Sequence, residues 1–261
     1  MTVKAPTTAR LQRRNHGKGH SYKIDGVRAI GVTTALNALA KPALIDWAAR
    51  VTSEYAVNNW DELAALPPAT RLDRIGRARW DTVKEAAVRG TRIHDLGEKV
   101  SHGVEVEVPD ELRGPVDAYA RFLDEWEIEM VATETPCCNT KHRYAGTADG
   151  WATIGRTGEK VLLDIKTGKG VYSEAALQLA AYRYCDLVQF GGPDSETDMA
   201  PVDAVYVAHV LPDTVRLLPV VAGPDEFRTF LYALQLHRHN EATKEDPLIG
   251  EAIFPEAYAN V

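Results

Sequence analysis

Three short apolar segments separated by tight turns most strongly constrain how this chain can fold. Residues 128–136, 141–154 and 160–167 are rich in apolar and β-branched side chains, and a turn containing two glycines at 155–158 joins the last two. Short apolar runs bounded by glycine are typical of buried strands. Strands joined by short turns pair in the antiparallel sense. The pattern therefore predicts a three-stranded antiparallel meander.

The last two of these strands carry charged side chains where burial is expected. Asp149 lies near the end of the second strand, and Asp164 and Lys166 lie on the third. Because strand side chains alternate between faces, Asp164 and Lys166 share one face and Ile165 points to the other. A charged pair in an apolar strand is costly to bury unless it is compensated. We therefore expect two carboxylates and one ammonium to converge on a functional site, in preference to a purely structural ion pair.

Helical patterns surround the meander. They predict an α/β (α+β) fold in which a mixed central sheet is flanked by helices and follows an N-terminal helical lobe. Before the meander, we expect a hairpin at 21–32 and helices at 33–40, 42–59, 68–89, 90–102 and 110–126, with Gly90-Thr91 as a break between the third and fourth helices. After the meander, we expect a helix at 173–190 capped by Ser173, strands at 203–210 and 214–221, and a helix at 224–243.

These elements group into four segments. Residues 1–20 are expected to be a basic flexible tail, 21–127 a hairpin and helical lobe, 128–222 the core, and 223–261 a C-terminal helix and tail. The chain has 261 residues and is 45% hydrophobic, which suffices for one large core.

Charge is distributed unevenly along the chain. The net charge of −7 disfavours a passive coating of nucleic acid. Residues 1–28 nevertheless contain seven Lys and Arg residues against one Asp, so the remainder is strongly acidic. A basic segment on an acidic body suggests either a polyanionic partner met locally or a solubilising tail, and charge alone does not choose between them.

Cysteine usage and hydropathy bear on the compartment. Three cysteines, Cys137, Cys138 and Cys185, are an odd number and argue against a disulfide framework. They are also fewer than the four that usually hold an iron–sulfur cluster or a structural zinc. No apolar run approaches the roughly 20 residues of a membrane span, and the N-terminus lacks an apolar signal segment. We expect a cytoplasmic protein without a membrane partner.

An arginine row marks the helix after Pro67-Pro68. Arg71, Arg74 and Arg77 recur at three-residue spacing, which aligns their guanidinium groups along one side of a helix and suits phosphate oxygens. The alternative is a solvated face whose arginines pair with Asp73 and Asp81. Both interpretations remain open from the sequence.

Three short motifs follow one another in a fixed order among a helix, three strands, a helix and a strand. They are Gly146-x-x-Asp149, Asp164-x-Lys166 and Gln178-x-x-x-Tyr182, and a segment at 90–94 that ends at His94 precedes them. This ordered set resembles the PD-(D/E)XK nuclease superfamily. Within it, the chain is most similar to the RecB-like exonucleases found in phages and beside CRISPR systems. The resemblance covers about residues 85–210.

The resemblance implies a restriction-endonuclease-like core and a role for each matched residue. His94, Asp149, Asp164 and the carbonyl of Ile165 correspond to metal ligands, and Lys166 corresponds to the catalytic lysine. Gln178 and Tyr182 correspond to residues that brace the site and the DNA backbone. Glu98 and Glu134 are additional carboxylates for which a structural role is favoured. Candidate DNA contacts are Arg71, Arg74, Arg77, Arg92 and Lys169.

Elementary chemistry is consistent with these roles. A phosphodiester is anionic and repels hydroxide, so its hydrolysis benefits from a cation that screens the phosphate and acidifies water. Carboxylate oxygens suit Mg²⁺ or Mn²⁺. Lys166 can orient the attacking water or stabilise charge that develops on the phosphate.

The leading hypothesis is therefore a metal-dependent deoxyribonuclease. The resemblance implies an exonuclease that acts on linear single- or double-stranded DNA in recombination, repair or phage DNA processing. It also implies a location in the host cytoplasm if the protein is phage-encoded, and, by analogy, an annealing or helicase partner. Alternatives are a catalytically silent DNA-binding or assembly protein of the same fold, and a restriction-type endonuclease. Because the iron–sulfur branch of the family uses four cysteines, we expect no cluster.

Overall fold

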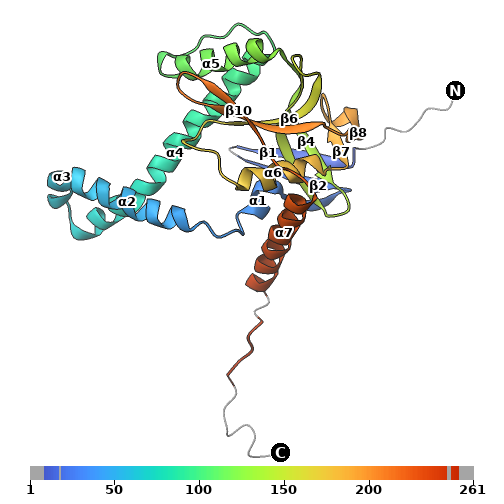
Figure 1. Cartoon of the computed structure of the whole chain (residues 1–261). Coiled ribbons are helices and arrows are strands. Elements are labelled where there is room, and N and C mark those ends of the chain that lie inside the picture. Colours follow the sequence, from blue (N-terminus) through green and yellow to red (C-terminus); the bar gives the residue numbers. More distant parts are fainter. Residues whose placement is uncertain (1–8, 18, 246–247, 253–261) are drawn as a thin grey trace, which may run out of the picture.

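A ten-stranded mixed sheet forms the centre of the molecule (Figure 1). The structure is a computed structural model that describes residues 9–17, 19–245 and 248–252. The strands are β1 (Leu11–His16), β2 (Gly19–Ile24), β3 (Val27–Gly31), β4 (Ile128–Asn139), β5 (Tyr144–Ile154), β6 (Glu159–Lys166), β7 (Leu187–Gln189), β8 (Glu196–Asp198), β9 (Ala204–Val210) and β10 (Val215–Pro219).

Seven α-helices accompany the sheet in the described part of the chain. They are α1 (Val32–Leu36), α2 (Pro42–Asn58), α3 (Trp60–Ala64), α4 (Pro68–Ser101), α5 (Asp110–Trp126), α6 (Glu174–Arg183) and α7 (Pro224–Glu245). A short 3₁₀ turn at Pro193–Ser195 precedes β8. None of the helices in the described ranges combines the length and apolar character needed to cross a bilayer.

The sheet topology confirms the predicted meander. β4 pairs antiparallel with β5, and β5 pairs antiparallel with β6. β3 joins β5 in parallel, and β9 joins β6 in parallel, so the sheet is mixed. The continuous path runs β1-β2-β3-β5-β4-β7-β8, while β6, β9 and β10 branch from β5. The predicted α/β (α+β) class, with a mixed central sheet flanked by helices, is confirmed.

Helices cover both faces of the sheet and create two apolar cores. Helices α1, α6 and α7 pack on one face, where Leu36, Leu179 and Phe230 are buried. Helix α5 and the C-terminal part of α4 pack on the other face, where Tyr119 and Leu163 are buried. The sheet is therefore the middle layer of three.

The N-terminal segment differs from the expected flexible tail. Residues Leu11–His16 form β1, which pairs with β2 in a continuous antiparallel register from Leu11↔Ile24 to His16↔Gly19. Leu11 is fully buried beside Tyr22 and Ile24. One apolar side chain gives no periodicity by itself, so the strand was not apparent without its partner. The boundary expected at residue 20 falls inside β2, and residues 1–8 and 18 lie outside the described residues.

Helix α4 also differs from prediction, because it continues through Gly90-Thr91 to Ser101. One glycine in a helix interior costs only about 1 kcal/mol relative to alanine, and packing outweighs that cost. A Cβ at Gly90 would lie 3.1 Å from Oγ1 of Thr167, so glycine permits close approach of the segment after β6.

The helix after the meander is shorter than predicted. Helix α6 ends at Arg183, and Leu187–Gln189 then form β7 against β4, with Cys138 opposite Leu187. Ser173 makes no side-chain capping bond, contrary to expectation. Helix α1 is likewise shorter than the helix predicted at 33–40, because it begins at Val32 and ends at Leu36. Burial of Leu187 and Val188 in the sheet explains why the helical pattern stops.

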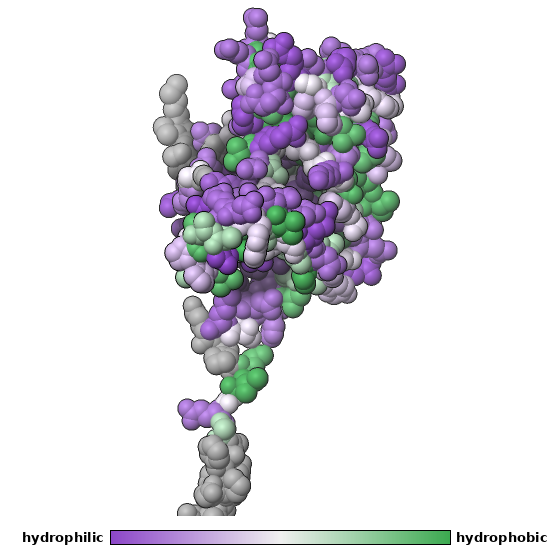
Figure 2. All heavy atoms as spheres, turned by 90° about the vertical axis from the view of Figure 1, so that its left-hand side faces the viewer, coloured by the Kyte–Doolittle hydropathy of each residue, from purple (hydrophilic) through white to green (hydrophobic). Residues whose placement is uncertain are grey.

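Helices α2 and α3 and the N-terminal part of α4 extend away from the sheet as an arm (Figure 1). None of the residues of α2 is fully buried. Viewed from the side of the arm, the surface is mostly hydrophilic with small scattered apolar groups (Figure 2). The arm therefore owes its form to helix–helix packing of α2 on α4 and to polar contacts, with little burial.

Candidate active site

A fork in the sheet positions the predicted site. The start of β5 pairs with β3 at Tyr144 and Ala145, whereas its end pairs with β6 from Gly150 onward. The intervening residues 146–149 have no strand partner on this side among the residues that the structure describes. Beyond Leu163, β6 separates from β5 and continues beside β9. Asp149 and Asp164 thus lie where two strands diverge and leave space between them.

One backbone group at the fork uses a side chain as its partner. The N–H of Ile165 donates a hydrogen bond of 2.7 Å to Oδ2 of Asp149. A strand N–H that has lost its ladder partner must be satisfied elsewhere, and this carboxylate supplies the acceptor. The contact ties β6 to β5 across the gap. Ile165 was predicted to act through its carbonyl, whereas the contact that the structure shows involves its N–H.

Asp164 and Lys166 form a buried ion pair, as their shared strand face predicted. Nζ of Lys166 lies 2.6 Å from Oδ2 of Asp164, whose side chain is only 1% exposed. Neither carboxylate oxygen of Asp164 has a partner with hydrogen-bond geometry among the described residues. A buried carboxylate with unused acceptors is expensive unless a further cation or donor is present.

The electrostatics of this pair reflect burial. Burial raises the pKa of Asp164 to about 7, and the nearby Asp149 carboxylate adds to the rise. Burial works to lower the pKa of Lys166, but the charges of Asp164 and Asp149 outweigh it and raise that pKa. The ammonium therefore stays charged, while the carboxylates lack sufficient positive charge around them.

A chain of polar contacts extends from Lys166 to α6. Nζ of Lys166 lies 3.4 Å from Oε1 of Gln178, and Nε2 of Gln178 donates to the Tyr182 hydroxyl at 3.3 Å. Gln178 and Tyr182 are one helical turn apart and face the fork together. A Cβ at Gly146 would lie 2.4 Å from the ring of Tyr182, so only glycine leaves room for this ring. The structure thereby brings four of the sequence motif residues into contact.

Three ligand groups converge beside this chain. One ligand atom from each of His94, Glu134 and Asp149 lies within 4.8 Å of the other two. Nδ1 of His94 is 3.9 Å from Oδ2 of Asp149. His94 comes from α4, Glu134 from β4 and Asp149 from β5. The long helix α4 thus reaches the sheet at the place where its histidine meets two carboxylates.

Glu134 is the site residue for which sequence reasoning favoured a structural role. Its backbone has φ of 44°, a left-handed conformation that is unfavourable for a residue with a Cβ. Its register neighbours, Thr133 opposite Gly150 and Thr135 opposite Ala148, place it across from Asp149. The predicted antiparallel pairing of these two strands was the available signal, but it does not give the register that places Glu134 across from Asp149.

Like charges crowd this cluster. Although part of the Glu134 side chain is exposed, desolvation of its carboxyl raises the pKa of that group to about 7, and Asp149 and Glu98 contribute further. Glu98 accepts a hydrogen bond of 2.8 Å from the Thr133 hydroxyl, which fixes it in a supporting position. Hard oxygen donors and one imidazole without a matching cation are a donor set that suits a divalent ion. The residues present therefore fit a divalent metal ion, with Asp164 adjoining the group.

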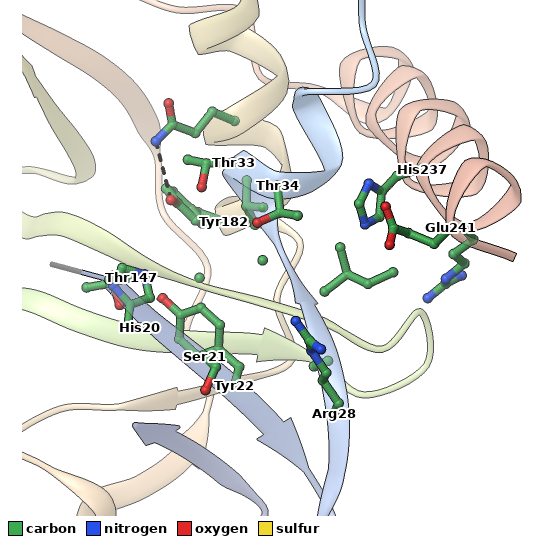
Figure 3. Close-up of a pocket in the computed structure, with 18 of the residues that line it drawn as sticks. His20, Ser21, Tyr22, Arg28, Thr33, Thr34, Thr147, Tyr182, His237 and Glu241 are labelled. Atoms are coloured by element: carbon green, nitrogen blue, oxygen red, sulfur yellow. Dashed lines mark hydrogen bonds between the residues drawn. The ribbon is translucent and has the colours of Figure 1, made fainter. Parts of the chain in front are cut away.

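A cavity of about 740 Å³ opens beside the cluster, and we call it the central cavity (Figure 3). Glu134, Asp149, Gln178 and Tyr182 contribute to its wall. The strands β2, β3 and β5 and the helices α1, α6 and α7 enclose it. Figure 3 shows Arg28 and, from α7, His237 and Glu241 on the side away from Tyr182. The carboxylates are thus accessible to a molecule that enters from the surface.

The predicted arginine row makes intramolecular contacts. Arg74 pairs with Glu62, and Arg77 pairs with Asp73 at 3.0 Å. The guanidinium of Arg71 donates to three backbone carbonyls near the end of α3, those of Leu63, Ala64 and Leu66. The three arginines therefore make contacts within the arm. The interpretation of the row as a face of paired arginines accounts for these contacts better than the interpretation as a phosphate-binding row.

The remaining candidate DNA contacts lie nearer to the site. Arg92 pairs with Glu111 at 3.1 Å on the exposed side of α4. Lys169 is exposed in the segment between β6 and α6.

Cys137, Cys138 and Cys185 are buried as free thiols, and burial raises the pKa of Cys138 to about 12, which makes it unreactive.

Comparisons with known proteins give partial matches. No family model matches the chain. The chain is 38% identical over 132 residues to a DNA ligase of Methylorubrum extorquens, a match that covers 42% of this chain and 16% of that protein. The chain thus spans about one sixth of that relative. The crystal structure of SSO0001 aligns over 84% of this chain and 78% of its own, at 17% identity and a TM-score of 0.36.

Proposed function

We propose that this protein is a divalent-metal-dependent deoxyribonuclease that hydrolyses phosphodiester bonds. The observation that carries the proposal is the ion pair between buried Asp164 and Lys166, in which Oδ1 of Asp164 has no hydrogen-bond partner among the described residues, beside the convergent His94, Glu134 and Asp149. A structural ion pair would have its acceptors satisfied. A hydrolytic metal site leaves them for a cation.

His94, Glu134, Asp149 and Asp164 are the groups that would hold Mg²⁺ or Mn²⁺. When bound, the ion screens the charge of a phosphodiester and lowers the pKa of water at the site. The N–H of Ile165 holds the Asp149 carboxylate in place through one oxygen. The strained backbone of Glu134 aims a fourth side chain at the same point, which is a conformation that persists where function requires it.

Lys166 supplies the positive charge that belongs to the protein itself. Its ammonium remains protonated because Asp164 and Asp149 raise its pKa, so it can donate hydrogen bonds to a phosphate oxygen on which charge develops. Gln178 limits the positions of that ammonium, and the Tyr182 hydroxyl in turn positions Gln178. Gln178 and Tyr182 are therefore positioning residues.

The identity of the substrate as DNA is supported from two directions. The ordered motifs resemble RecB-like exonucleases, and the partial relative is named a DNA ligase. The same resemblance favours an exonuclease of recombination, repair or phage DNA processing that acts in the cytoplasm. The central cavity gives a DNA end or strand access to Glu134 and Asp149.

A cleavage assay tests this proposal. End-labelled linear DNA and closed-circular DNA are incubated with the protein and Mg²⁺, Mn²⁺ or a chelator. Wild type, Asp164→Asn, Lys166→Ala and the control Lys160→Ala are compared, because Lys160 is an exposed lysine of the same strand. We expect metal-dependent cleavage by wild type and Lys160→Ala, little by the other two variants, and a preference for linear DNA. Cleavage that persists with the chelator or in Lys166→Ala would refute the proposal.

A further inference from the structure

Two additional pockets adjoin the central cavity. One, here called the hairpin pocket, measures about 630 Å³ and lies between the β1–β2 hairpin and α4; it shares Gly19 and His20 with the central cavity. The other, here called the helix pocket, measures about 340 Å³ beside α7 and shares Arg28, Ile30 and Arg238 with it. The shared wall residues make the hairpin pocket and the helix pocket neighbours of the central cavity, whose wall contains the carboxylates Glu134 and Asp149.

The charges of these walls alternate along this path. Arg13, Lys84 and Arg92 line the hairpin pocket, and no described wall residue there is acidic, although Arg92 is paired with Glu111 outside this wall. The helix pocket is lined by Arg28, Lys141, Arg143 and Arg238, again without a described acidic wall residue. The acidic wall residues, Glu134, Asp149 and Glu241, belong to the central cavity. On a chain with a net charge of −7, cationic walls on both sides of an acidic centre indicate a site for an extended polyanion.

Arg13 connects the hairpin pocket to the carboxylates. It lies opposite Tyr22 in the β1–β2 ladder and therefore shares that residue's inward face. Its Nε is buried and has no hydrogen-bond partner among the described residues. The charge of Arg13 is near enough to Glu134 to oppose the rise in the pKa of that carboxyl. An unpartnered guanidinium donor at this position is available for a phosphate oxygen.

The helix pocket has a similar character. Nη2 of Arg238 donates to the carbonyl of His142 at 2.6 Å, which holds α7 against the β4–β5 turn. Arg143 has φ of 52°, a strained conformation in that turn. Arg28 and Lys141 are exposed. The guanidinium of Arg143 donates to the carbonyl of Ile24 at 3.2 Å, so two anchored and two exposed cations surround this pocket.

The dimensions favour a single strand. The central cavity lies within the range of pockets that enclose small molecules, roughly 300–1,000 Å³. A volume of this size suits a short piece of one strand better than a duplex, whose major groove alone is about 12 Å wide. Single-strand binding sites combine a basic groove with exposed flat side chains. His20, at the junction of two of the pockets, provides one such ring.

We propose that the three pockets form one track for a single strand of DNA, whose backbone phosphates rest in the hairpin pocket and the helix pocket on either side of the carboxylate cluster. This proposal relies on the proposed function for the identity of the strand as DNA. The cluster then acts on the linkage that lies between two electrostatic anchors. The arginine row of the arm takes no part.

Binding without cleavage tests the track. Fluorescence anisotropy follows a labelled oligonucleotide of about 16 nucleotides, the upper end of single-strand site sizes, in chelator and over a series of salt concentrations. The variants are Arg13→Gln and the double change Arg28→Gln with Lys141→Gln. Arg14→Gln, on the opposite face of β1, and Arg228→Gln, an exposed arginine of α7 paired with Asp225, are the controls. A duplex of the same sequence is measured in parallel.

We expect the single strand to bind more tightly than the duplex. The slope of log affinity against log salt should fall by about 0.7 in Arg13→Gln and about 1.4 in the double variant, since each phosphate contact contributes about 0.7 for single strands. The control variants should keep the wild-type slope. Equal slopes in all variants, or tighter binding of the duplex, would overturn the proposal. Variant-sensitive binding by a protein that never cleaves DNA would support the track and refute the nuclease.

Discussion

The fork of the sheet and the helical arm both carry charged side chains that are candidate functional residues in the sequence, but the environments of these side chains differ. At the fork, Asp164 is 1% exposed, its Oδ2 contacts only the Lys166 ammonium, and its Oδ1 has no hydrogen-bond partner among the described residues. In the arm, Arg74 and Arg77 are exposed and each pairs with a neighbouring carboxylate. A buried charge without enough hydrogen-bond partners is destabilising unless a ligand or cation binds to it, whereas an exposed ion pair contributes little to stability. The difference indicates function at the fork and support in the arm.

The largest expected effect separates these two regions by activity. Replacing Lys166 with alanine removes the donor that faces developing phosphate charge and should lower the cleavage rate by about 10²–10³-fold. Replacing Arg77 in the arm should change it by less than about twofold, because its ion pair is exposed. Initial rates on end-labelled DNA at saturating Mg²⁺ measure both. Equal losses in the two variants would erase the distinction.

The second prediction concerns metal affinity. Glu134→Gln removes one carboxylate from the convergent group and should weaken Mn²⁺ binding by about 10–100-fold, the range seen when groups that support a metal site are lost. Glu129→Gln, an exposed position on the same strand, serves as the control. Isothermal titration with Mn²⁺ measures both affinities. Unchanged affinity in Glu134→Gln would return that residue to a structural role.

One substitution should have opposite effects on stability in the two regions. Gly146→Ala drives a methyl group into the ring of Tyr182 and should lower the free energy of unfolding by about 1–3 kcal/mol. Gly76→Ala, in the arm part of α4, meets no atom within 4 Å and should raise it by up to about 1 kcal/mol through helix propensity. Urea unfolding measures both values. A stabilising Gly146→Ala would show that the fork is loosely packed.

The smallest expected effect is a pH dependence of stability without metal. Because the folded-state pKa values of Asp164 and Glu134 are raised to about 7, the folded protein holds protons that the unfolded chain releases at lower pH. The free energy of unfolding should therefore fall as pH rises from about 4 through 7. Thermal unfolding in chelator at several pH values measures this trend.

Two comparisons test whether Asp164 and Glu134 cause this fall in the free energy of unfolding with pH. Asp164→Asn combined with Glu134→Gln should flatten the decline between about pH 5 and 8, whereas a matched change at exposed Glu129 should not. Added Mn²⁺ should raise the melting temperature most at the higher pH, where the carboxylates are free to bind it. A melting temperature that rises with pH in the chelator would contradict the assignment of these two groups.

Local patterns predicted the parts of the fold in which each segment buries its own apolar surface. The apolar runs of β5 and β6 and the helical patterns of α2 and α5 are encoded within a few residues, so these elements appear where expected. β1 depends on Leu11 meeting Ile24 of its partner, which no local pattern reveals. Helix α4 continues past Gly90 because packing at both ends outweighs one residue's preference.

In the candidate site too, some contacts follow from local sequence patterns and others depend on how distant segments pair. The shared face of Asp164 and Lys166 follows from strand geometry alone, and the structure confirms their contact. The position of Glu134 across from Asp149 requires the register of two strands. Arg13 at the adjoining pocket requires a hairpin that places it beside Tyr22. Sequence therefore indicates which charges meet along one strand, while tertiary register determines which others join them.

Anomalous diffraction from crystals soaked in Mn²⁺ tests most directly whether the fork is a metal site. We predict a strong anomalous peak within coordination distance of carboxylate oxygens of Asp149 and Asp164, with His94 and Glu134 beside it, and loss of that peak in Asp164→Asn. An anomalous peak confined to other parts of the molecule, or none at saturating Mn²⁺, would contradict it.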